Sequence, residues 1–208
     1  AENVMKMAEG NLDFEVKVMS EHDIMAKSCI KTRDTLRALV ADAKMLSQAA
    51  IEGRLATRAD ASKHQGEYRR IVQGVNDTLD AVIGPLNVAA EYVERISRGD
   101  VPEPITDNYN GDFNEIKNNL NACIGGLQGL VECNNVLHLM AVNDHTKRVE
   151  GEYIGIYASM GEATNYVRDR LLNVTKQLNN LAIGNTSELE ELKKIGKRSE
   201  QDIIMPAI

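Results

Sequence analysis

Residues 86–113 read LNVAAEYVERISRGDVPEPITDNYNGDF, and this stretch decides the fold. Its first half carries apolar residues in steps of three, four and three: Leu86, Ala89, Val93 and Ile96. A mean step of about 3.5 residues is typical of helices that wind around a partner helix. Gly99 follows this run and predicts that the helix ends in a left-handed cap. Two prolines, Pro102 and Pro104, then forbid helix in the next segment.

The same unit recurs along the chain, with helix-ending pairs 41 to 46 residues apart. These pairs are Gly10-Asn11, Gly53-Arg54, Gly99-Asp100, Asn143-Asp144 and Gly184-Asn185. The apolar steps before the cap also recur, at Leu130, Cys133, Leu137 and Met140 and again at Leu171, Val174, Leu178 and Leu181. Because separate stretches repeat one spacing, the sequence predicts a helical repeat protein.

A second helix is expected to open about a dozen residues after each helix end. The openings share carboxylates that complement the helix dipole: Glu21 and Asp23, Glu67, Asp112, Glu152, and Glu200 with Asp202. Glycine precedes the middle three, at Gly66, Gly111 and Gly151, whereas Ser20 and Ser199 are the expected outer caps. Each second helix is expected to run without a break into the next unit, because the apolar steps continue through the junction.

Connector length predicts how the two helices of a unit are arranged. A helix of roughly 16 residues is about 24 Å long, and about twelve extended residues can span roughly 40 Å. The connector can therefore return to the end where the first helix began, which makes the two helices parallel. Two narrow apolar stripes cannot close a core alone, whereas two chains supply four helices. The predicted fold is all-α: an elongated parallel homodimer of stacked four-helix bundles with continuous junction helices.

The unit resembles the HAMP domain, the parallel four-helix dimeric linker of bacterial and archaeal signal receptors. The tandem arrangement is similar to a poly-HAMP array of a methyl-accepting chemotaxis transducer. The family connector carries a glycine followed at the second and sixth positions by apolar residues that pack on the bundle. The matching residues are Gly10, Leu12 and Val16; Gly53, Leu55 and Ala59; Gly99, Val101 and Ile105; Asn143, His145 and Val149; and Gly184. Pro85 matches a proline of the family's first helix.

The resemblance implies five HAMP-like units, of which the first and the last are truncated. Their expected ranges are 1–34, 35–83, 84–127, 128–170 and 171–208.

Composition and charge exclude several classes of partner. The 208 residues carry a net charge of −7 and include no tryptophan, two phenylalanines and six tyrosines. An acidic chain is a poor ligand for phosphate backbones, so no nucleic acid partner is expected. The longest nearly apolar stretch, residues 81–90, is about half the length of a membrane span, so no direct membrane insertion is expected. Three cysteines without a C-x-x-C pair favour the cytoplasm.

No constellation of residues indicates catalysis, a cofactor or a metal. His22 lacks the context of a phosphorylated helix, and His138 and His145 lack the further ligands that zinc needs. The three cysteines are expected to be small, buried seam residues: Cys29, Cys123 and Cys133. The glycines of one junction helix form no phosphate loop and are expected to mark a thin or flexible stretch: Gly125, Gly126 and Gly129.

The function expected from this organisation is signal relay, without enzymatic activity, in the cytoplasmic part of a membrane-bound or soluble chemotaxis receptor. Small and polar seam residues bring alternative packings close in free energy: Ala43, Ser47, Ala50, Thr78 and Ala163. The expected partners are a second copy of the chain and a downstream signalling or kinase-control region. Two alternatives stay open: the linker of a sensor histidine kinase, and a passive helical-repeat scaffold. A HEAT-type scaffold would be monomeric, with antiparallel helices.

Overall fold

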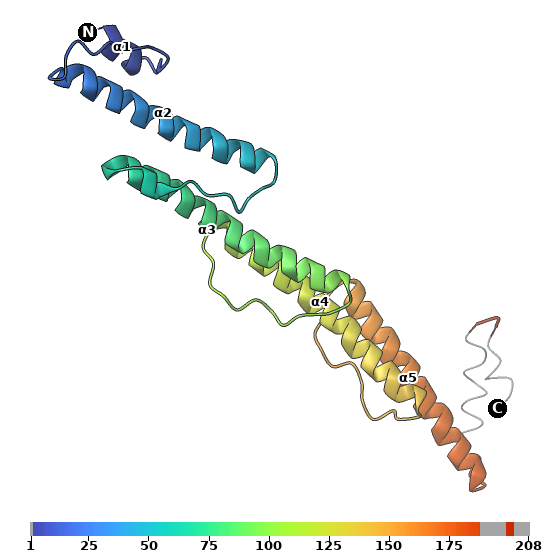
Figure 1. Ribbon diagram of the computed structural model, residues 1–208. Coiled ribbons are helices and arrows are strands. Elements are labelled where there is room, and N and C mark those ends of the chain that lie inside the picture. Colours follow the sequence, from blue (N-terminus) through green and yellow to red (C-terminus); the bar gives the residue numbers. More distant parts are fainter. Residues whose placement is uncertain (1, 188–198, 202–208) are drawn as a thin grey trace. The chain divides into compact units, whose positions relative to one another are not determined.

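A computed structural model describes residues 2–187 and 199–201, and these residues form helices and no strand. The α-helices are α1 (Glu2–Ala8), α2 (Ile24–Ile51), α3 (Gly66–Ser97), α4 (Asp112–Ala141) and α5 (Ile156–Ala182), and η1 (Ala61–Lys63) is a short 3₁₀ helix (Figure 1). The prediction of an all-α fold is confirmed. The prediction of unbroken junction helices is confirmed as well, because each of the four long helices crosses a predicted unit boundary.

All five α-helices end at a residue with left-handed backbone, as the sequence predicts. The φ angles are +80° at Gly10, +74° at Gly53, +81° at Gly99, +63° at Asn143 and +78° at Gly184. At the end of α3, Asp100 donates its N–H to the carbonyl of Arg95 at 3.0 Å, and Gly99 donates to Ile96 at 2.9 Å. The other four ends repeat this pair of bonds. The pair is the Schellman motif, which satisfies carbonyls that a helix end leaves free.

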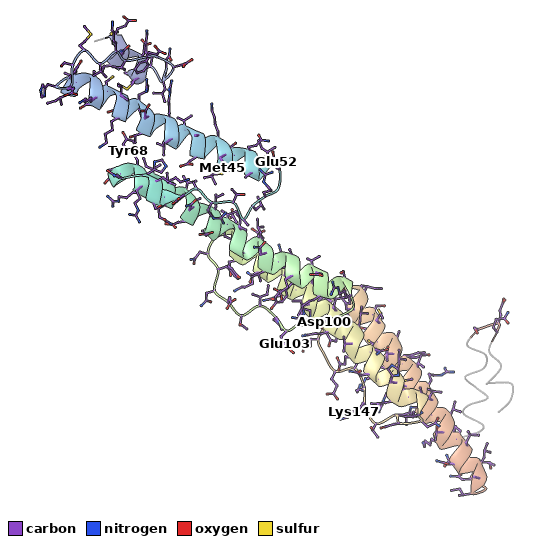
Figure 2. The ribbon with its side chains drawn as sticks, viewed as in Figure 1. Met45, Glu52, Tyr68, Asp100, Glu103 and Lys147 are labelled. Carbon is purple, nitrogen blue, oxygen red and sulfur yellow. The ribbon has the colours of Figure 1, made fainter. Side chains whose placement is uncertain are left out.

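In the N-terminal part of the chain, Ala1–Glu91, helices α2 and α3 are parallel. Glu52, directly after α2, and Tyr68, at the start of α3, lie at opposite ends of the pair, and the connector runs back between them (Figure 2). The small core forms where the connector meets the helices. Its members are Ala59, Ala61 and Val72, with Leu39 and Leu46 packed against them.

In the C-terminal part, Tyr92–Ile208, helices α4 and α5 are parallel neighbours. Gly126 of α4 lies against the ring of Tyr157, near the start of α5. Farther along both helices, Val149 of the connector lies beside Gly161 of α5. Val149 also packs into the core cluster of Cys133, Val136 and Met140 on α4, with Tyr153 against it. The connector is therefore the layer that joins the two helices.

Helix α5 begins four residues later than the sequence signature predicts, so the placement of Glu152 in its first turn is wrong. Two Gly-x-Tyr motifs follow one another here, and the second occupies the opening position. Gly155 precedes the helix with φ 59° and ψ −132°, a region that only glycine adopts readily. Tyr153 of the first motif bonds to α4 instead. With this start, the connectors before α3, α4 and α5 each have fourteen residues.

The start of α2 also differs from the prediction. Glu21 and Asp23 precede the helix, so neither lies in its first turn, and Ser20 is not its cap. Asp23 is the N-cap and accepts the N–H groups of Ala26 at 3.0 Å and Met19 at 3.1 Å. These two hydrogen bonds hold the pKa of Asp23 below its usual value.

The remaining predicted helix openings are placed as follows. Glu67 and Asp112 lie in the first turns of α3 and α4. Glu200 is an exposed residue of a turn, and Asp202 lies outside the described residues.

Candidate functional site

An asparagine in each of α3, α4 and α5 holds the connector that precedes it. The side chain of Asn76 accepts the N–H of Ala59 at 3.1 Å and donates to its carbonyl at 2.8 Å. Asn121 makes the same pair of bonds with Ile105, at 2.7 and 3.0 Å. Asn165 makes it with Val149, at 2.9 Å for both bonds. A carboxamide has an acceptor and a donor side by side, so it can bind both polar groups of one peptide residue.

The residue held in this way is the sixth after each helix end. Ala59, Ile105 and Val149 are between 5% and 7% exposed, so each is a buried residue of its connector, although His64 and Pro102 in the connectors before α3 and α4 are buried more deeply. An extended connector has no ladder or helix to satisfy its backbone. A buried N–H or carbonyl without a partner costs about 1–3 kcal/mol. The asparagine removes that cost and fixes the connector in one register against the helix.

In the N-terminal part, a buried histidine ties the end of the connector to α2. The side chain of His64 is 1% exposed, and its Nε2 lies 2.6 Å from Oδ2 of Asp42. Asp60, nearby in the connector, accepts the hydroxyl of Ser62 at 2.6 Å and its N–H at 3.0 Å. These two bonds hold the pKa of Asp60 below its usual value. The polar groups therefore fold the connector into η1 and fasten it to the first helix.

In the C-terminal part, Glu132 of α4 gathers three donors from the following connector. It accepts the N–H groups of Glu150 at 2.8 Å and Gly151 at 3.2 Å, and the hydroxyl of Tyr153 at 2.7 Å. Burial works to raise the pKa of Glu132, but the three hydrogen bonds outweigh it and hold this pKa below its usual value. The same contact, with burial, raises the pKa of Tyr153 to about 12. Glu132 therefore binds as a carboxylate and Tyr153 as a neutral phenol.

Two arginines bind connector carbonyls four residues after a helix end. Arg33 of α2 donates through Nη1 to the carbonyl of Phe14 at 2.8 Å, and its guanidinium lies 5.8 Å from the centroid of the Phe14 ring. Arg168 of α5 donates through Nε to the carbonyl of Lys147 at 2.8 Å. The equivalent positions of α3 and α4 hold apolar residues, Leu79 and Ile124.

The glycines of α4 serve close packing, which corrects the prediction that they mark a thin or flexible stretch. A Cβ atom added at Gly126 would overlap the ring of Tyr157, and one at Gly129 would lie 3.0 Å from Cδ1 of Tyr153. Gly125 has nothing within 4 Å of such an atom. Two of the three glycines therefore make room for tyrosine rings from the connector and from α5.

Helices α3 and α5 each carry an apolar stripe that the described residues of the chain leave exposed. On α3 and α5 the stripe consists of residues that are 38% to 61% exposed: Ile71, Val75, Val82, Leu86, Val93, Met160, Val167, Leu171, Leu178 and Leu181. In the N-terminal part it borders an apolar groove of about 520 Å³ between α2 and α3. The groove is lined by Leu39, Val40, Ala43, Leu46, Ala50 and Val75, among others. Contiguous apolar surface of this kind marks an interface.

The other predicted connector residues are less buried than the clamped ones. Val16, at the sixth position of the first connector, is half-buried. At the second position, Leu12, Val101 and His145 are half-buried, whereas Leu55 is 42% exposed.

Pro85 and the three cysteines are the remaining predicted residues on the helices. Pro85 lies inside α3, where the helix continues through it. In the single chain Cys133 is buried, Cys29 is half-buried and Cys123 is exposed, so the burial of all three on a seam shared by two chains stays a prediction. The described part of the chain contains no group of three or more His, Cys, Asp or Glu side chains that could hold a metal ion.

The segment with two asparagine clamps, α3, the next connector and the first turns of α4, matches a known family. Residues 63–129 match the family model of the HAMP domain. HAMP domains are signalling linkers, not catalytic domains, in receptors such as chemotaxis transducers and histidine kinases. The HAMP segment includes these predicted residues: Glu67, Pro85, Gly99, Val101, Ile105 and Asp112.

Two other findings accompany the HAMP match. No solved structure matches the chain. None of the helices in the described ranges is both long enough and apolar enough to cross a lipid bilayer.

Sequence reasoning missed the residues that fasten the connectors of the HAMP segment and its neighbours. The asparagines stand ten residues after the opening glycines: Asn76 after Gly66, Asn121 after Gly111, and Asn165 after Gly155. This offset is visible in the sequence once Gly155 replaces Gly151 as the third opening. Asp42 stands between Ala41 and Ala43, and Glu132 between Val131 and Cys133, and no period in the sequence distinguishes these acids from solvated ones.

Proposed function

We propose that the chain is a run of tandem HAMP units that passes conformational change along dimeric bundles to a downstream output region of a chemotaxis receptor. The observation that carries this proposal is the recurrence of one connector clamp at Asn76, Asn121 and Asn165. The first two lie inside the HAMP segment and the third lies beyond it. A third copy of the same local structure supports further units on the same plan, with the ranges 1–34, 35–83, 84–127, 128–170 and 171–208.

A second copy of the chain is the proposed partner of the exposed stripe. The helices within a unit are parallel, so two units related by a two-fold axis supply four parallel helices around one core. The groove between α2 and α3 is apolar and is lined by small residues on α2, including Ala43 and Ala50. A facing pair of helices would fill it. The proposed connector roles of Gly10, Gly53, Gly99, Asn143 and Gly184 are the same in each protomer.

The small residues in that seam also support switching between two packings. Ala43, Ser47 and Ala50 line the groove, and none of them supplies a large side chain to fix one arrangement. Bundles with such seams can hold alternative packings within a few kcal/mol of each other. An unbroken helix such as α3 then carries a rotation or tilt from one unit into the next. The output region is proposed to lie downstream, on the cytoplasmic side of the receptor.

The test is to lock one unit and observe another. In the 208-residue chain with its native cysteines replaced (Cys29→Ser, Cys123→Ser, Cys133→Ala), Val40→Cys adds a single thiol to the groove. Oxidation should link two protomers at this position, and the same variant alkylated at the thiol is the matched control. Hydrogen exchange along α5 should differ by several-fold between linked and alkylated protein.

Two results would contradict the proposal. If the chain is monomeric and never forms the disulfide, there is no dimer, and the proposed relay through dimeric bundles is refuted. If the amides of α5 exchange at the same rates in the linked dimer and in the alkylated control, the lock is not passed on to α5. That result would favour a passive scaffold instead of a relay. The parallel helices already disagree with an antiparallel HEAT-type repeat. A linker of a sensor histidine kinase would give the same result as a chemotaxis linker, since both relay signals.

A further inference from the structure

Two repeat units have a carboxylate on their first helix at a position where the unit between them has valine. Asp42 and Glu132 each lie eleven residues before the left-handed residue that ends their helix, Gly53 and Asn143. Eleven residues before Gly99 the chain has Val88. This comparison uses the observed helix ends, so it does not depend on where the unit boundaries are drawn.

Both carboxylates bind the part of the connector that leads into the second helix. Asp42 holds His64, two residues before α3. Glu132 holds Glu150, Gly151 and Tyr153, shortly before α5. The asparagine clamps, by contrast, reach the connector from the second helix. In these two units the connector is therefore fastened from both helices.

We infer that Asp42 and Glu132 are latches that hold the connector of their own unit against its first helix, and that residues 84–127 form a unit without this latch. The inference goes beyond signal relay, because it divides the units into two classes and assigns the easier connector release to the HAMP unit in the middle. The latch depends on neither the dimer nor the relay. It can therefore be refuted while both of those proposals hold, and they can be refuted while the latch holds.

The chemistry of Glu132 makes the latch specific for a carboxylate. All three of its partners are donors, and a charged acceptor binds them more strongly than a neutral one. Glu132→Gln keeps the size of the side chain but replaces one acceptor oxygen with a donor, which faces the donors already present. The substitution should therefore release the connector without creating a cavity.

Hydrogen exchange of single amides in the full chain tests the latch directly. Glu132→Gln should speed the exchange of the Glu150 and Gly151 amides by about tenfold, which corresponds to the loss of one charged hydrogen bond. Glu2→Gln is the matched control, because Glu2 pairs with Lys6 within α1 and the substitution removes the same charge. That control should leave both amides unchanged. In the wild-type chain, the amides of the connector 98–111 should exchange faster than those of Glu150 and Gly151.

The pH profile separates a latch from a general loss of stability. The pKa of Glu132 is lowered by its partners, so the hold should be complete above the ordinary carboxylate pKa of about 4.3 and weaken as pH falls through the lowered value. Tyr153, whose pKa is raised to about 12, is neutral in this range. The other titratable groups around the contact are Cys133 and the connector acids Glu150 and Glu152. The wild-type amides should show this acid step in protection, and Glu132→Gln should not.

Asp42→Asn tests the latch at Asp42 in the same way. The amides of Lys63 and His64, which close η1 on Asp60 and Ala61, should exchange several-fold faster in this variant. If Glu132→Gln changes neither of its amides, or speeds the connectors 98–111 and 142–155 equally, the latch is refuted. A response to only one of the two substitutions would refute a shared latch position.

Discussion

A single carboxamide at each of three positions gives an extended connector the backbone partners that a strand or helix would otherwise supply. Asn121 is the best place to measure this, because its bonds to Ile105 join a connector and a helix in the C-terminal part. The neighbouring Asn119 is exposed on the same helix. The two asparagines differ in role, and only Asn121 stands ten residues after the opening glycine Gly111.

Asn121→Ala should lower the free energy of unfolding by about 1–3 kcal/mol, because it leaves the N–H and carbonyl of Ile105 without their partner. Asn119→Ala should change it by less than about 1 kcal/mol, in the stabilising direction, since alanine is the better helix former. Urea unfolding followed by circular dichroism measures both. Equal effects of the two substitutions would show that the clamp contributes nothing to stability.

At the scale of elements, α4 approaches its neighbours through glycines. Gly126→Ala should destabilise the chain by about 1–2 kcal/mol, because overpacking against Tyr157 costs about 1–3 kcal/mol and exceeds the gain in helix propensity. Gly125→Ala should stabilise it by about 1 kcal/mol, since the added methyl meets open space. Thermal unfolding of the two variants gives the comparison.

The assignment to Tyr157 can be checked by removing the ring. In a Tyr157→Ala background, Gly126→Ala should become stabilising, because only the propensity gain remains. If Gly126→Ala is as stabilising as Gly125→Ala in the original background, the close packing seen at this glycine is absent in solution.

Elements were predictable where a local rule decides them, and were missed where two local rules compete. Left-handed helix ends follow from glycine or asparagine after an apolar run, and all five lie where the sequence predicts them. The start of α5 does not lie where the sequence predicts it, because Gly151 and Gly155 each stand two residues before a tyrosine. Only the contact of Tyr153 with Glu132 decides between them, and such a contact cannot be read from a one-dimensional pattern.

At the scale of the whole molecule, the exposed stripe predicts self-association. The unfolding temperature of a dimer rises with protein concentration, whereas that of a monomer does not. Val75→Glu should give a monomer, because a charge in the groove cannot be buried against a second copy without a partner. Gln73→Glu, exposed on the same helix, adds the same charge and should leave the dimer intact.

Sedimentation equilibrium measures this directly. The wild type and Gln73→Glu should have about twice the chain mass of 23.0 kDa, and Val75→Glu should have the chain mass. A wild-type chain that sediments as a monomer at all concentrations would contradict the assignment of the stripe to a second copy.

The connectors before α3, α4 and α5 have equal length, and the asparagine that clamps each of them stands ten residues after the opening glycine. Recombination between equivalent points of two such units leaves one intact connector and one unbroken helix at the join. Loss or duplication of a whole unit is therefore a single genetic event that disturbs no cap and no clamp. By contrast, a change of one residue within a helix shifts every later apolar position on that helix. The number of units is consequently free to vary in evolution, while the connector keeps the same length of fourteen residues before α3, α4 and α5.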